Sequence, residues 1–559
     1  MPGNYYTDNP DLVYHLHHVD LEEVVRLKED DFRERDRHPE APADYAEALA
    51  QYERRLQQVG ALCDERIAGR AMAVDQVGAT DADGQVTFAP GTVANVADLK
   101  EAGVMGVLLP RTYGGLNLPV TVYSMMTEMV SQADASLQNL FGLQNIAQTI
   151  YLFGDDEQKK RYLPGFASGK DDGAMALTEP EAGSDLQSVT TTADYDEATG
   201  EWRLNGIKHF ITNGCAKVLL VLARSEPGSR DGRGLSLFIV KAGPGVIIKR
   251  IEDKLGIHGS PTCEVHFQNA PGELLGKRRY GLTRYVMSLM NGARLAISAQ
   301  AVGVAEAARI AAWKYARQRQ QFGRTLDQIP AVWEMLTRQD ALTVAARTLL
   351  YETSRYVDLR DAWAEWSERY PEDATARETS KRYSRLADLC TPLSKAFATE
   401  AANQVAYDSI QCHGGKGYMR EQQVERLYRD ARIMNIYEGT TQLQIVAATG
   451  GLVKRVLEPA LDELAALPFS GEAAELAARV AEAREITAAC LAFVEEDSSS
   501  RLDLAARRLV RMVTLVYVSY LLLRDAMRDN ARLAITRRFI WEFLPEVGMH
   551  DCVVRDTQP

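Results

Sequence analysis

The chain has 559 residues, of which 46% are hydrophobic and 25% are charged, and this composition indicates a folded protein of several domains. Its formal net charge of −13 argues against a nucleic-acid partner, because neutralising phosphates requires a concentrated basic surface. Its seven cysteines include no CxxC pair and no zinc-type Cys/His spacing, which argues against a structural metal and favours a reducing, cytoplasmic location.

No segment of the sequence predicts a membrane span. The first 23 residues carry Asp, Glu and His without an apolar core, so they do not predict a signal peptide. The longest apolar run, Met512–Leu523, is too short to cross a bilayer. We expect it to form a buried helix or a subunit contact, with a membrane-surface contact as the alternative.

The first third of the chain, from Leu21 to about Lys170, is mostly helical in pattern. Residues Tyr45–Arg70 carry apolar side chains at helical spacing, and Pro110–Gly115 interrupts the pattern as a loop. From Ala174 to about Gly276, short β-rich runs alternate with Gly, Asn and Asp turns. This change predicts a compact β domain.

Helices are predicted again beyond Leu282, for example over Ala293–Gln318 and Ala331–Arg355. The charged segment Asp361–Thr379 contains a proline, and we expect it to be a surface insertion between two helices. A last helical block runs from about Leu452 to Asp551.

These patterns predict an α+β multi-domain fold. No GxGxxG sequence follows a predicted strand, and the nearest candidate, His413–Tyr418, lies between helices, so a Rossmann nucleotide site has little support. The expected parts are an N-terminal arm (1–45), an N-terminal helical domain (46–172), a middle β domain (173–277), a helical bundle (278–450) and a C-terminal helical extension (451–559).

The loop Leu177–Asp185, which reads LTEPEAGSD, is the first candidate functional segment. Pro180 ends regular strand pairing, and Gly183 permits close approach to the backbone. Such a loop can present amides and hydroxyls, including that of Ser184, to a phosphate or a ring edge. An ordinary turn of the β domain is the alternative interpretation.

The second candidate is Leu204–Gly214, which reads LNGIKHFITNG. Asn205-Gly206 predicts a hairpin turn, and Asn213-Gly214 predicts a second turn. Between them, Phe210 and Thr212 share one face of a strand, where a ring and a hydroxyl can stack on and hydrogen-bond a planar cofactor. Core packing is the commoner role of such residues.

The third candidate is Glu438, which lies between Tyr437 and Gly439 at a predicted break between two helices. A carboxylate with aromatic and apolar neighbours is a candidate general base. A glutamate at a helix N-terminus is also a routine capping residue, so this segment alone does not identify a base.

Together these segments resemble the acyl-CoA dehydrogenase family over roughly Leu99 to Ala448, most of the chain. Any one motif can arise by chance, but the ordered set is specific. The motifs are TEPEAGSD, NGIKHFITNG, RQRQQFGRTL (Arg317–Leu326), QCHGGKGY (Gln411–Tyr418), RDARI (Arg429–Ile433) and YEGTTQLQ (Tyr437–Gln444). The resemblance implies an acyl-CoA dehydrogenase-like fold, FAD as cofactor and oxidation of an acyl-CoA thioester, as in β-oxidation.

A finer resemblance lies in Lys254–Gly276 and Met290–Gln300. These segments are similar to the larger members of the family, which carry a C-terminal helical extension and include broad-range fatty acyl-CoA and 3-methylmercaptopropionyl-CoA dehydrogenases. The block Leu452–Asp551 fits that branch. An added domain can cover the second interface of a family tetramer, so we expect a homodimer.

The resemblance implies that Glu438 removes the α-proton of the thioester while flavin N5 accepts the β-hydride, yielding a trans-2-enoyl-CoA. Electrons then pass to electron-transfer flavoprotein. Some branches of the family place the base at the position of Ala293. Alanine cannot accept a proton, and this strengthens the assignment of Glu438 as the base. The nearby carboxylates Glu421 and Glu425 are expected to be solvated.

The resemblance also implies which residues bind the cofactor and the substrate. Residues expected to contact the flavin and its phosphates are Leu177, Thr178, Gly183, Ser184, Phe210 and Thr212. Residues expected to reach FAD, some across the dimer, are Arg319, Phe322, Gln411, Gly415, Thr440 and Gln442. Expected substrate contacts are Ser184, Arg294, Tyr437 and Gly439.

Two other functions stay open beside the dehydrogenase. An acyl-CoA oxidase would use the same fold and base with oxygen as acceptor. A DNA-associated relative of the family's alkylation-response branch would need a basic C-terminal block, but here Arg507–Arg511 and Arg532–Arg538 are offset by acids such as Glu495–Asp497. The acyl group is not determined by these motifs.

Overall fold

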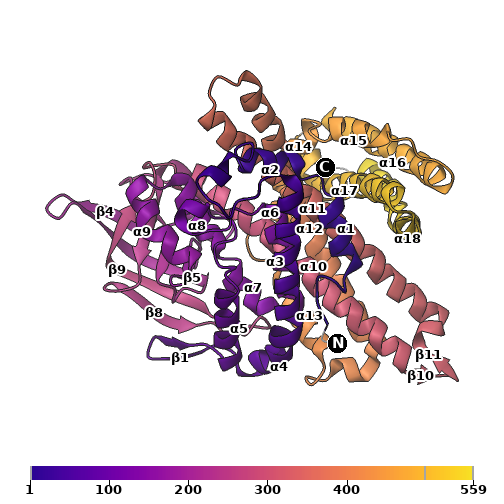
Figure 1. Cartoon of the computed structure of the whole chain (residues 1–559), viewed down its shortest axis with the longest axis horizontal. Coiled ribbons are helices and arrows are strands. Elements are labelled where there is room, and N and C mark those ends of the chain that lie inside the picture. Colours follow the sequence, from indigo (N-terminus) through magenta and orange to yellow (C-terminus); the bar gives the residue numbers. More distant parts are fainter. Residues whose placement is uncertain (1–2, 497–498, 557–559) are drawn as a thin grey trace. The chain divides into compact units, whose positions relative to one another are not determined.

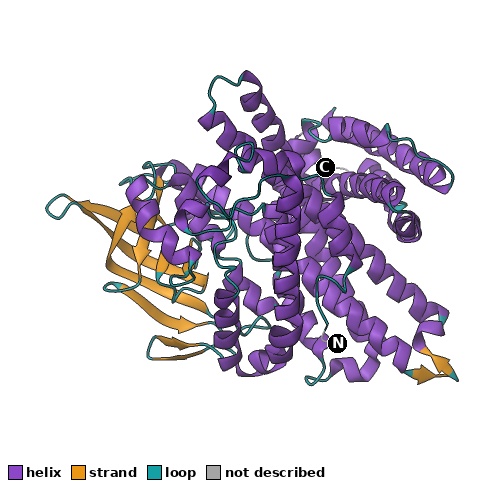
Figure 2. Cartoon of the chain, viewed as in Figure 1, coloured by secondary structure: helices purple, strands orange, loops and turns teal. Residues whose placement is uncertain are grey.

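The computed structural model describes residues 3–496 and 499–556, which form two compact units (Figure 1). The first unit comprises Met1–Pro10 and Asp31–Ala296, and the second comprises Asp11–Asp30 and Ile297–Pro559. Along the chain, a helical block, a group of strands and a second helical block follow one another as expected, which confirms the α+β multi-domain fold (Figure 2).

The N-terminal helices of the first unit surround a largely buried helix, α6, whose side chains are nearly all inaccessible to solvent. Asp134 caps the following helix by accepting hydrogen bonds from the backbone N–H groups of Ser136 and Leu137. These helices are α3 (Tyr45–Leu62), α4 (Ala68–Val77), α5 (Pro90–Glu101), α6 (Val120–Ala133), α7 (Ala135–Phe141), α8 (Gln144–Phe153) and α9 (Asp156–Ala167), with a short hairpin of β1 (Thr80–Ala82) and β2 (Gln85–Thr87).

The strands of the middle domain form a closed barrel. Strand β6 pairs with β7, β7 with β9, β9 with β5, β5 with β4, and β4 again with β6. Alternate side chains therefore point into an apolar interior. The strands are β3 (Gly173–Ala176), β4 (Thr192–Asp196), β5 (Glu201–Thr212), β6 (Val218–Arg224), β7 (Leu235–Lys241), β8 (Val246–Ile251) and β9 (Thr262–Leu274).

The hairpin turn predicted at Asn205-Gly206 is wrong, because these residues lie inside the continuous strand β5. The register between β5 and β9 shifts between Leu204 and Gly206, as at a β-bulge. A side chain at Gly206 would come within 2.7 Å of the Cα atom of Thr191, so the glycine is required by close packing. The turn before β5 ends instead at Gly200, whose φ is 72°.

A second apolar core joins the β domain to the helices of the first unit. Ile146 and Ile150 of α8 and Tyr162 of α9 pack in one cluster with Leu220 of β6 and Leu237 of β7. The same core includes Leu177 and Ala182 of the loop that follows β3, so it supports that loop.

The described residues of the second unit are helical apart from connecting loops and the short hairpin of β10 (Gln320–Gln321) and β11 (Arg324–Thr325). Its long helices α11 and α12 pack along one another. The bundle helices are α10 (Met287–Gln318, from Ile297 in this unit), α11 (Pro330–Arg369), α12 (Ala374–His413), α13 (Gln423–Ile433) and α14 (Thr441–Val453). The extension consists of α15 (Glu458–Ala465), α16 (Glu472–Glu495), α17 (Ser499–Arg528), α18 (Leu533–Phe543) and α19 (Glu546–Asp556).

The expected insertion over Asp361–Thr379 is not a separate segment. Helix α11 continues to Arg369 and α12 begins at Ala374, so only four residues connect the two long helices. Pro371 lies in this connection, where it interrupts no helical hydrogen bond.

The apolar run Met512–Leu523 lies within α17 and is buried, as expected for a core helix. Within the described part of the chain, one helical segment, Gly281–Gln318, is long and apolar enough to span a membrane by hydropathy alone. Of its most apolar window, 83% is buried inside the structure, as in the core helix of a folded protein.

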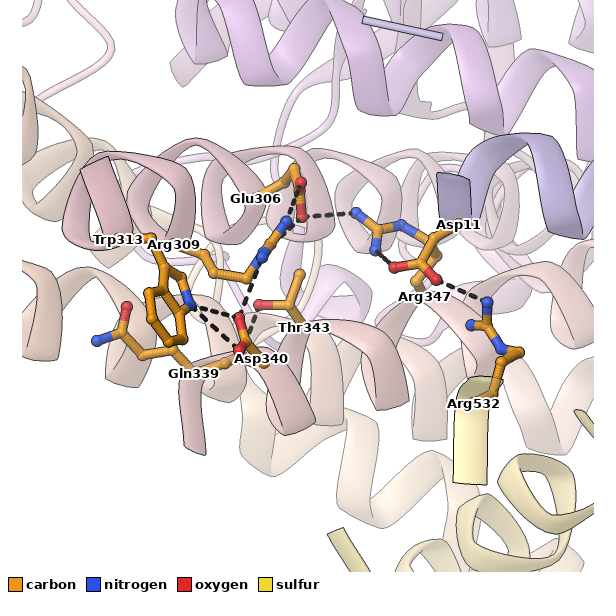
Figure 3. A network of polar contacts seen from close by, with 9 residues as sticks. All are labelled: Asp11, Glu306, Arg309, Trp313, Gln339, Asp340, Thr343, Arg347 and Arg532. Atoms are coloured by element: carbon orange, nitrogen blue, oxygen red, sulfur yellow. Dashed lines mark hydrogen bonds and ion pairs between the residues drawn. The ribbon is translucent and has the colours of Figure 1, made fainter. Parts of the chain in front are cut away.

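The expected N-terminal arm contributes two helices to the second unit, α1 (Pro10–His18) and α2 (Glu22–Lys28). Asp11 pairs with Arg347 of α11 at 3.0 Å and with Arg532 of the extension at 2.7 Å (Figure 3). Arg347 also pairs with the buried Glu306 at 3.0 Å, and Glu306 pairs with Arg309 at 2.6 Å. This network links α1, the bundle and the extension within one unit.

Candidate active site

The loop after β3 is held from behind by a buried ion pair. Lys208 Nζ donates to the Glu179 carboxylate at 2.9 Å and to the carbonyl oxygen of Leu177 at 2.8 Å. Burial alone would raise the pKa of Glu179, but Lys208, Thr191 and Thr190 outweigh it and lower the pKa to about 2. The pair therefore fixes the backbone of the loop.

The outer face of this loop carries the predicted flavin contacts. The carbonyl oxygen of Thr178 accepts a hydrogen bond from the N–H of His209, which joins the loop to β5. Gly183 and Ser184 are exposed, and a side chain at Gly183 would meet only a methyl group of Thr178, at 3.9 Å. The loop thus offers open space above a fixed backbone.

A second register shift in β5, between Lys208 and Ile211, turns Phe210 outward. Phe210 has a φ of 58° and an exposed fraction of 61%, which is high for an aromatic ring on a strand. Ile211 points into the barrel interior, and Phe210 and Thr212 lie on either side of it. The bulge therefore presents a free aromatic face next to the loop.

The predicted substrate contact Arg294 lies on α10 in the first unit. Its side chain is buried and donates a hydrogen bond to Asn291 at 3.1 Å. Ala293, the neighbouring position considered for an alternative base, is also buried.

In the second unit, Arg319 and Phe322 lie beyond the end of α10, on the β10–β11 hairpin. Phe322 and Gly323 have φ values of 54° and 75°, the left-handed pair of a two-residue hairpin turn. Phe322 is 91% exposed at the tip.

Gln411 and Gly415 lie at the C-terminal end of α12, which ends at His413. Both are exposed, and a side chain at Gly415 would meet nothing within 4 Å. Gly414, with a φ of 61°, turns the chain into the short 3-10 helix that follows. The glycines thus leave the backbone accessible here.

Glu438 lies in the connection between α13 and α14, as the sequence predicts. Glu438 and Gly439 have φ values of 53° and 87°, so two successive residues adopt left-handed backbone conformations. Thr440 then caps α14 by accepting a hydrogen bond from Leu443 N–H, and Gln442 is exposed in the first turn.

Lys395 of α12 holds this connection, and sequence patterns did not indicate it. It is completely buried, and its Nζ donates to the carbonyl oxygens of Tyr437 at 2.6 Å and Gly439 at 2.5 Å. Gln444 Nε2 adds a hydrogen bond to the Gly439 carbonyl at 2.8 Å. A lysine inside an apolar helical run is the one signal that could have identified it.

Tyr437 anchors the other side of the connection, because its hydroxyl donates to Gln300 of α10. Burial raises the pKa of Tyr437 above its ordinary value, and the Glu438 charge raises it further. The tyrosine therefore stays neutral and keeps donating this hydrogen bond.

The predictions for the two carboxylates near Glu438 are only partly correct. Glu421 is exposed, but Glu425 is half-buried and paired with Arg429 at 2.7 Å, so the expectation that it is solvated is wrong. The pair arises because the two residues are four apart on α13 and face the same side of the helix.

One cluster of possible metal ligands occurs among residues 3–496 and 499–556. It consists of His209, Glu252 and Glu264. Arg250 lies 2.9 Å from Glu264 and 3.5 Å from Glu252, so a guanidinium already compensates these carboxylates. The arrangement is that of an ion-pair network on the barrel surface.

Ten of the predicted site residues thus form two groups, each assembled within its own unit. In the first unit, hydrogen bonds join the loop of Leu177, Thr178, Gly183 and Ser184 to the strand that carries Phe210 and Thr212. In the second unit, Lys395 and Gln444 hold the connection that carries Tyr437, Glu438, Gly439 and Thr440.

Four family models match successive parts of the chain. They are the acyl-CoA dehydrogenase N-terminal domain (residues 51–170), middle domain (174–270) and C-terminal domain (283–366 and 373–450), and the model described as acyl-CoA dehydrogenase C terminal (456–537).

Known proteins are similar over the same regions. A 3-methylmercaptopropionyl-CoA dehydrogenase of Ruegeria pomeroyi is 36% identical over 78% of this chain and 78% of its own length. An acyl-CoA dehydrogenase of Bacillus subtilis is 38% identical over 61% of this chain and 85% of its own length. The solved acyl-CoA dehydrogenase of Bacillus anthracis in complex with FAD is 27% identical, covers 90% of this chain and 88% of its own, and superposes with a TM-score of 0.77.

Proposed function

Because this chain belongs to the acyl-CoA dehydrogenase family of FAD-dependent enzymes, we propose that it oxidises the Cα–Cβ bond of an acyl-CoA thioester to the trans-2-enoyl-CoA, with Glu438 as the base. The observation that carries the proposal is the position of Glu438 on a left-handed connection that Lys395 holds at both neighbouring carbonyl groups. A backbone held on both sides of the carboxylate orients that carboxylate.

The chain's own residues fit FAD. A planar ring system needs an exposed apolar face with polar groups nearby, and Phe210 offers such a face beside the fixed loop of Thr178 and Ser184. Open space at Gly183 and at Gly415 allows the backbone to approach phosphates or an adenine. These residues would hold the cofactor, and the chemistry that bound FAD supplies is acceptance of the β-hydride.

Proton removal is the step that the protein itself must make possible. An α-proton of a thioester is on the order of ten pKa units less acidic than a carboxylic acid, and each unit costs about 1.4 kcal/mol. Hydrogen bonds to the developing enolate oxygen must offset most of this difference. We propose that the backbone N–H of Glu438 supplies one of them, and that Lys395 keeps this N–H and the carboxylate in one orientation.

The proposal also covers substrate contacts, electron acceptor, assembly and location. Ser184, Arg294, Tyr437 and Gly439 would contact the acyl-CoA, and electron-transfer flavoprotein would take the electrons. A homodimer would let the exposed Phe322 reach a second protomer's cofactor. A cytoplasmic location is supported by the seven free cysteines.

The central test is turnover of a panel of acyl-CoA thioesters by the flavin-loaded enzyme, with an artificial electron acceptor and, in parallel, an oxygen electrode. We expect reduction of the artificial acceptor with little oxygen uptake, and 3-methylmercaptopropionyl-CoA belongs in the panel because the Ruegeria relative is named for it. Oxygen uptake at the rate of turnover would identify an oxidase instead. Purified protein without flavin would contradict the proposal.

Replacing the base gives a second test. Glu438→Gln should keep the yellow flavin and bind substrate but lose at least about 10³-fold in kcat, because the amide cannot take a proton. Glu421→Gln, on an exposed carboxylate nearby, serves as the matched control and should retain full activity. Retained activity in Glu438→Gln would place the base elsewhere.

A further inference from the structure

A cavity of about 440 Å³ lies within the second unit, between the bundle and the C-terminal extension. Helices α11, α12 and α14 form one wall, and α17, α18 and α19 form the other. The proposed oxidation does not use this cavity. We refer to it as the Arg508 cavity.

One part of the Arg508 cavity is apolar. Its lining includes Leu342 and Leu393 from the long bundle helices, Ile445 from α14, and the rings of Phe397 and Phe543. All five side chains are largely buried. A wall of this kind favours an alkyl chain over a polar ligand.

The other part is rich in guanidinium groups. Four arginines and two glutamates line the cavity, and one of the arginines, Arg338, also lies 3.6 Å from Glu542 outside the lining. With His550 neutral, an excess of one positive charge remains. Burial lowers the pKa of His550, and Arg511, Arg508 and Arg507 lower it further against the opposing effect of Glu546. The positive charge in the cavity therefore belongs to the arginines.

The arginines differ in how far they are neutralised. Arg511 makes two hydrogen bonds to Glu546, at 2.9 and 3.1 Å, and is fully paired. Arg507 reaches Glu400 only at 3.9 Å. For the buried Nε of Arg508 there is no hydrogen-bond partner among the residues that the structure describes.

A buried guanidinium N–H without a partner is costly, and an anion relieves that cost with a charge-assisted hydrogen bond. We propose that the Arg508 cavity binds an anionic amphiphile, with its phosphate or carboxylate group at Arg508 and its alkyl chain along Phe397, Ile445 and Phe543. A phospholipid or alkyl phosphate and a free fatty acid share this chemistry. The site is independent of the proposed oxidation, because none of its residues is assigned to flavin or acyl-CoA.

A ligand in the Arg508 cavity would contact α14, the helix that follows Glu438. Thr441 and Ile445 of α14 line the cavity, and α14 begins three residues after Glu438. The ligand would thus pack against the helix that anchors the Glu438 connection.

The test is calorimetric titration of the flavin-loaded protein with four probes: decyl phosphate, decanoate, decanol and inorganic phosphate. We expect one equivalent of decyl phosphate or decanoate to bind, and the tighter of the two identifies the head group. Decanol and inorganic phosphate should each bind at least about tenfold more weakly, because each lacks one half of the ligand. Equal binding of decanol would overturn the role of the anion, and equal binding of inorganic phosphate would overturn the role of the chain.

Variants locate the binding site on the protein. Arg508→Gln should weaken the preferred probe at least about tenfold, and Ala396→Phe, which adds a ring to the cavity wall, should weaken it independently of charge. Arg537→Gln, on an exposed arginine that pairs with Glu472 outside the cavity, is the matched control and should bind like the parent protein. Unchanged binding in both cavity variants would overturn the proposal, since an acyl chain bound at the flavin site would be insensitive to them.

Discussion

The ammonium group of Lys395 lies 2.5 Å from the carbonyl oxygen of Gly439, although the two residues are 44 positions apart in the chain. Together with its bond to the carbonyl of Tyr437, this contact holds the residues on both sides of Glu438. A buried lysine that donates to backbone carbonyls meets part of the hydrogen-bonding need of its ammonium group and fixes the backbone on both sides of the carboxylate.

Lys395→Met should therefore impair the orientation of the base more than substrate binding. Methionine fills a similar volume but leaves two carbonyl groups without this donor, and each lost hydrogen bond costs about 1–3 kcal/mol. We expect kcat to fall about 10–100-fold with a nearly unchanged KM and full flavin content, measured by steady-state turnover and absorbance.

The control for this prediction is Lys381→Met, on an exposed lysine of the same helix, which should leave kcat unchanged. Partial recovery of kcat by Lys395→Arg, which restores a donor, would support a positioning role. An unchanged kcat in Lys395→Met would contradict it.

Phe210→Ala should weaken flavin binding. The ring is exposed on a bulge beside the cofactor loop, and loss of one stacking contact costs about 0.5–1.5 kcal/mol, or roughly 2–12-fold in Kd. Titration of the apoprotein with FAD, followed by flavin fluorescence, measures the change. Ile207→Ala, at another exposed position of β5, is the control, and equal losses in the two variants would mean that the ring has no specific role.

Glu179→Gln should destabilise the first unit and loosen the Leu177–Asp185 loop, which we propose to bind the flavin. The change leaves Lys208 buried without a counter-charge, and breaking such a pair costs about 3–5 kcal/mol. The unfolding midpoint and the flavin content should both fall. Glu181→Gln, on the exposed side of the same loop, provides the comparison and should change neither.

The stability of the second unit should decline in acid through Glu306. Burial alone would raise the pKa of this carboxyl, but Arg309 and Arg347 outweigh it and lower the pKa to about 2. A carboxyl whose folded-state pKa is depressed stabilises the fold above its unfolded pKa, and the contribution is lost as the pH falls toward 2. The difference corresponds to about 3 kcal/mol.

Chemical unfolding at pH 7, 4.5 and 3 measures this loss. Glu306→Gln should be less stable at pH 7 and should depend less on pH below 4.5, because the titrating group is gone. Glu334→Gln, which removes an exposed partner of Arg538, should follow the pH dependence of the parent protein. The prediction fails if the free energy of unfolding of Glu306→Gln depends on pH as strongly as that of the parent protein.

Local patterns were sufficient to predict the order of helices and strands, the burial of Met512–Leu523 and the break that carries Glu438. Each depends on residues a few positions apart, whose hydrophobic spacing and turn chemistry act within one element. The same local rule failed at Asn205-Gly206. There, pairing with β9 and the close approach of Thr191 make the dipeptide a bulge inside a strand.

The amino-acid sequence by itself determined which elements form and which motifs they carry. Only the tertiary structure decided that Lys395 holds the Glu438 connection and that Lys208 and Glu179 pair beneath the Leu177–Asp185 loop. It also decided that Asp11 joins α1 to the helical bundle. The physical reason is that these contacts join residues 29 to 336 positions apart. Their energy depends on burial and on the geometry of facing elements, and spacing along the chain carries no information about either.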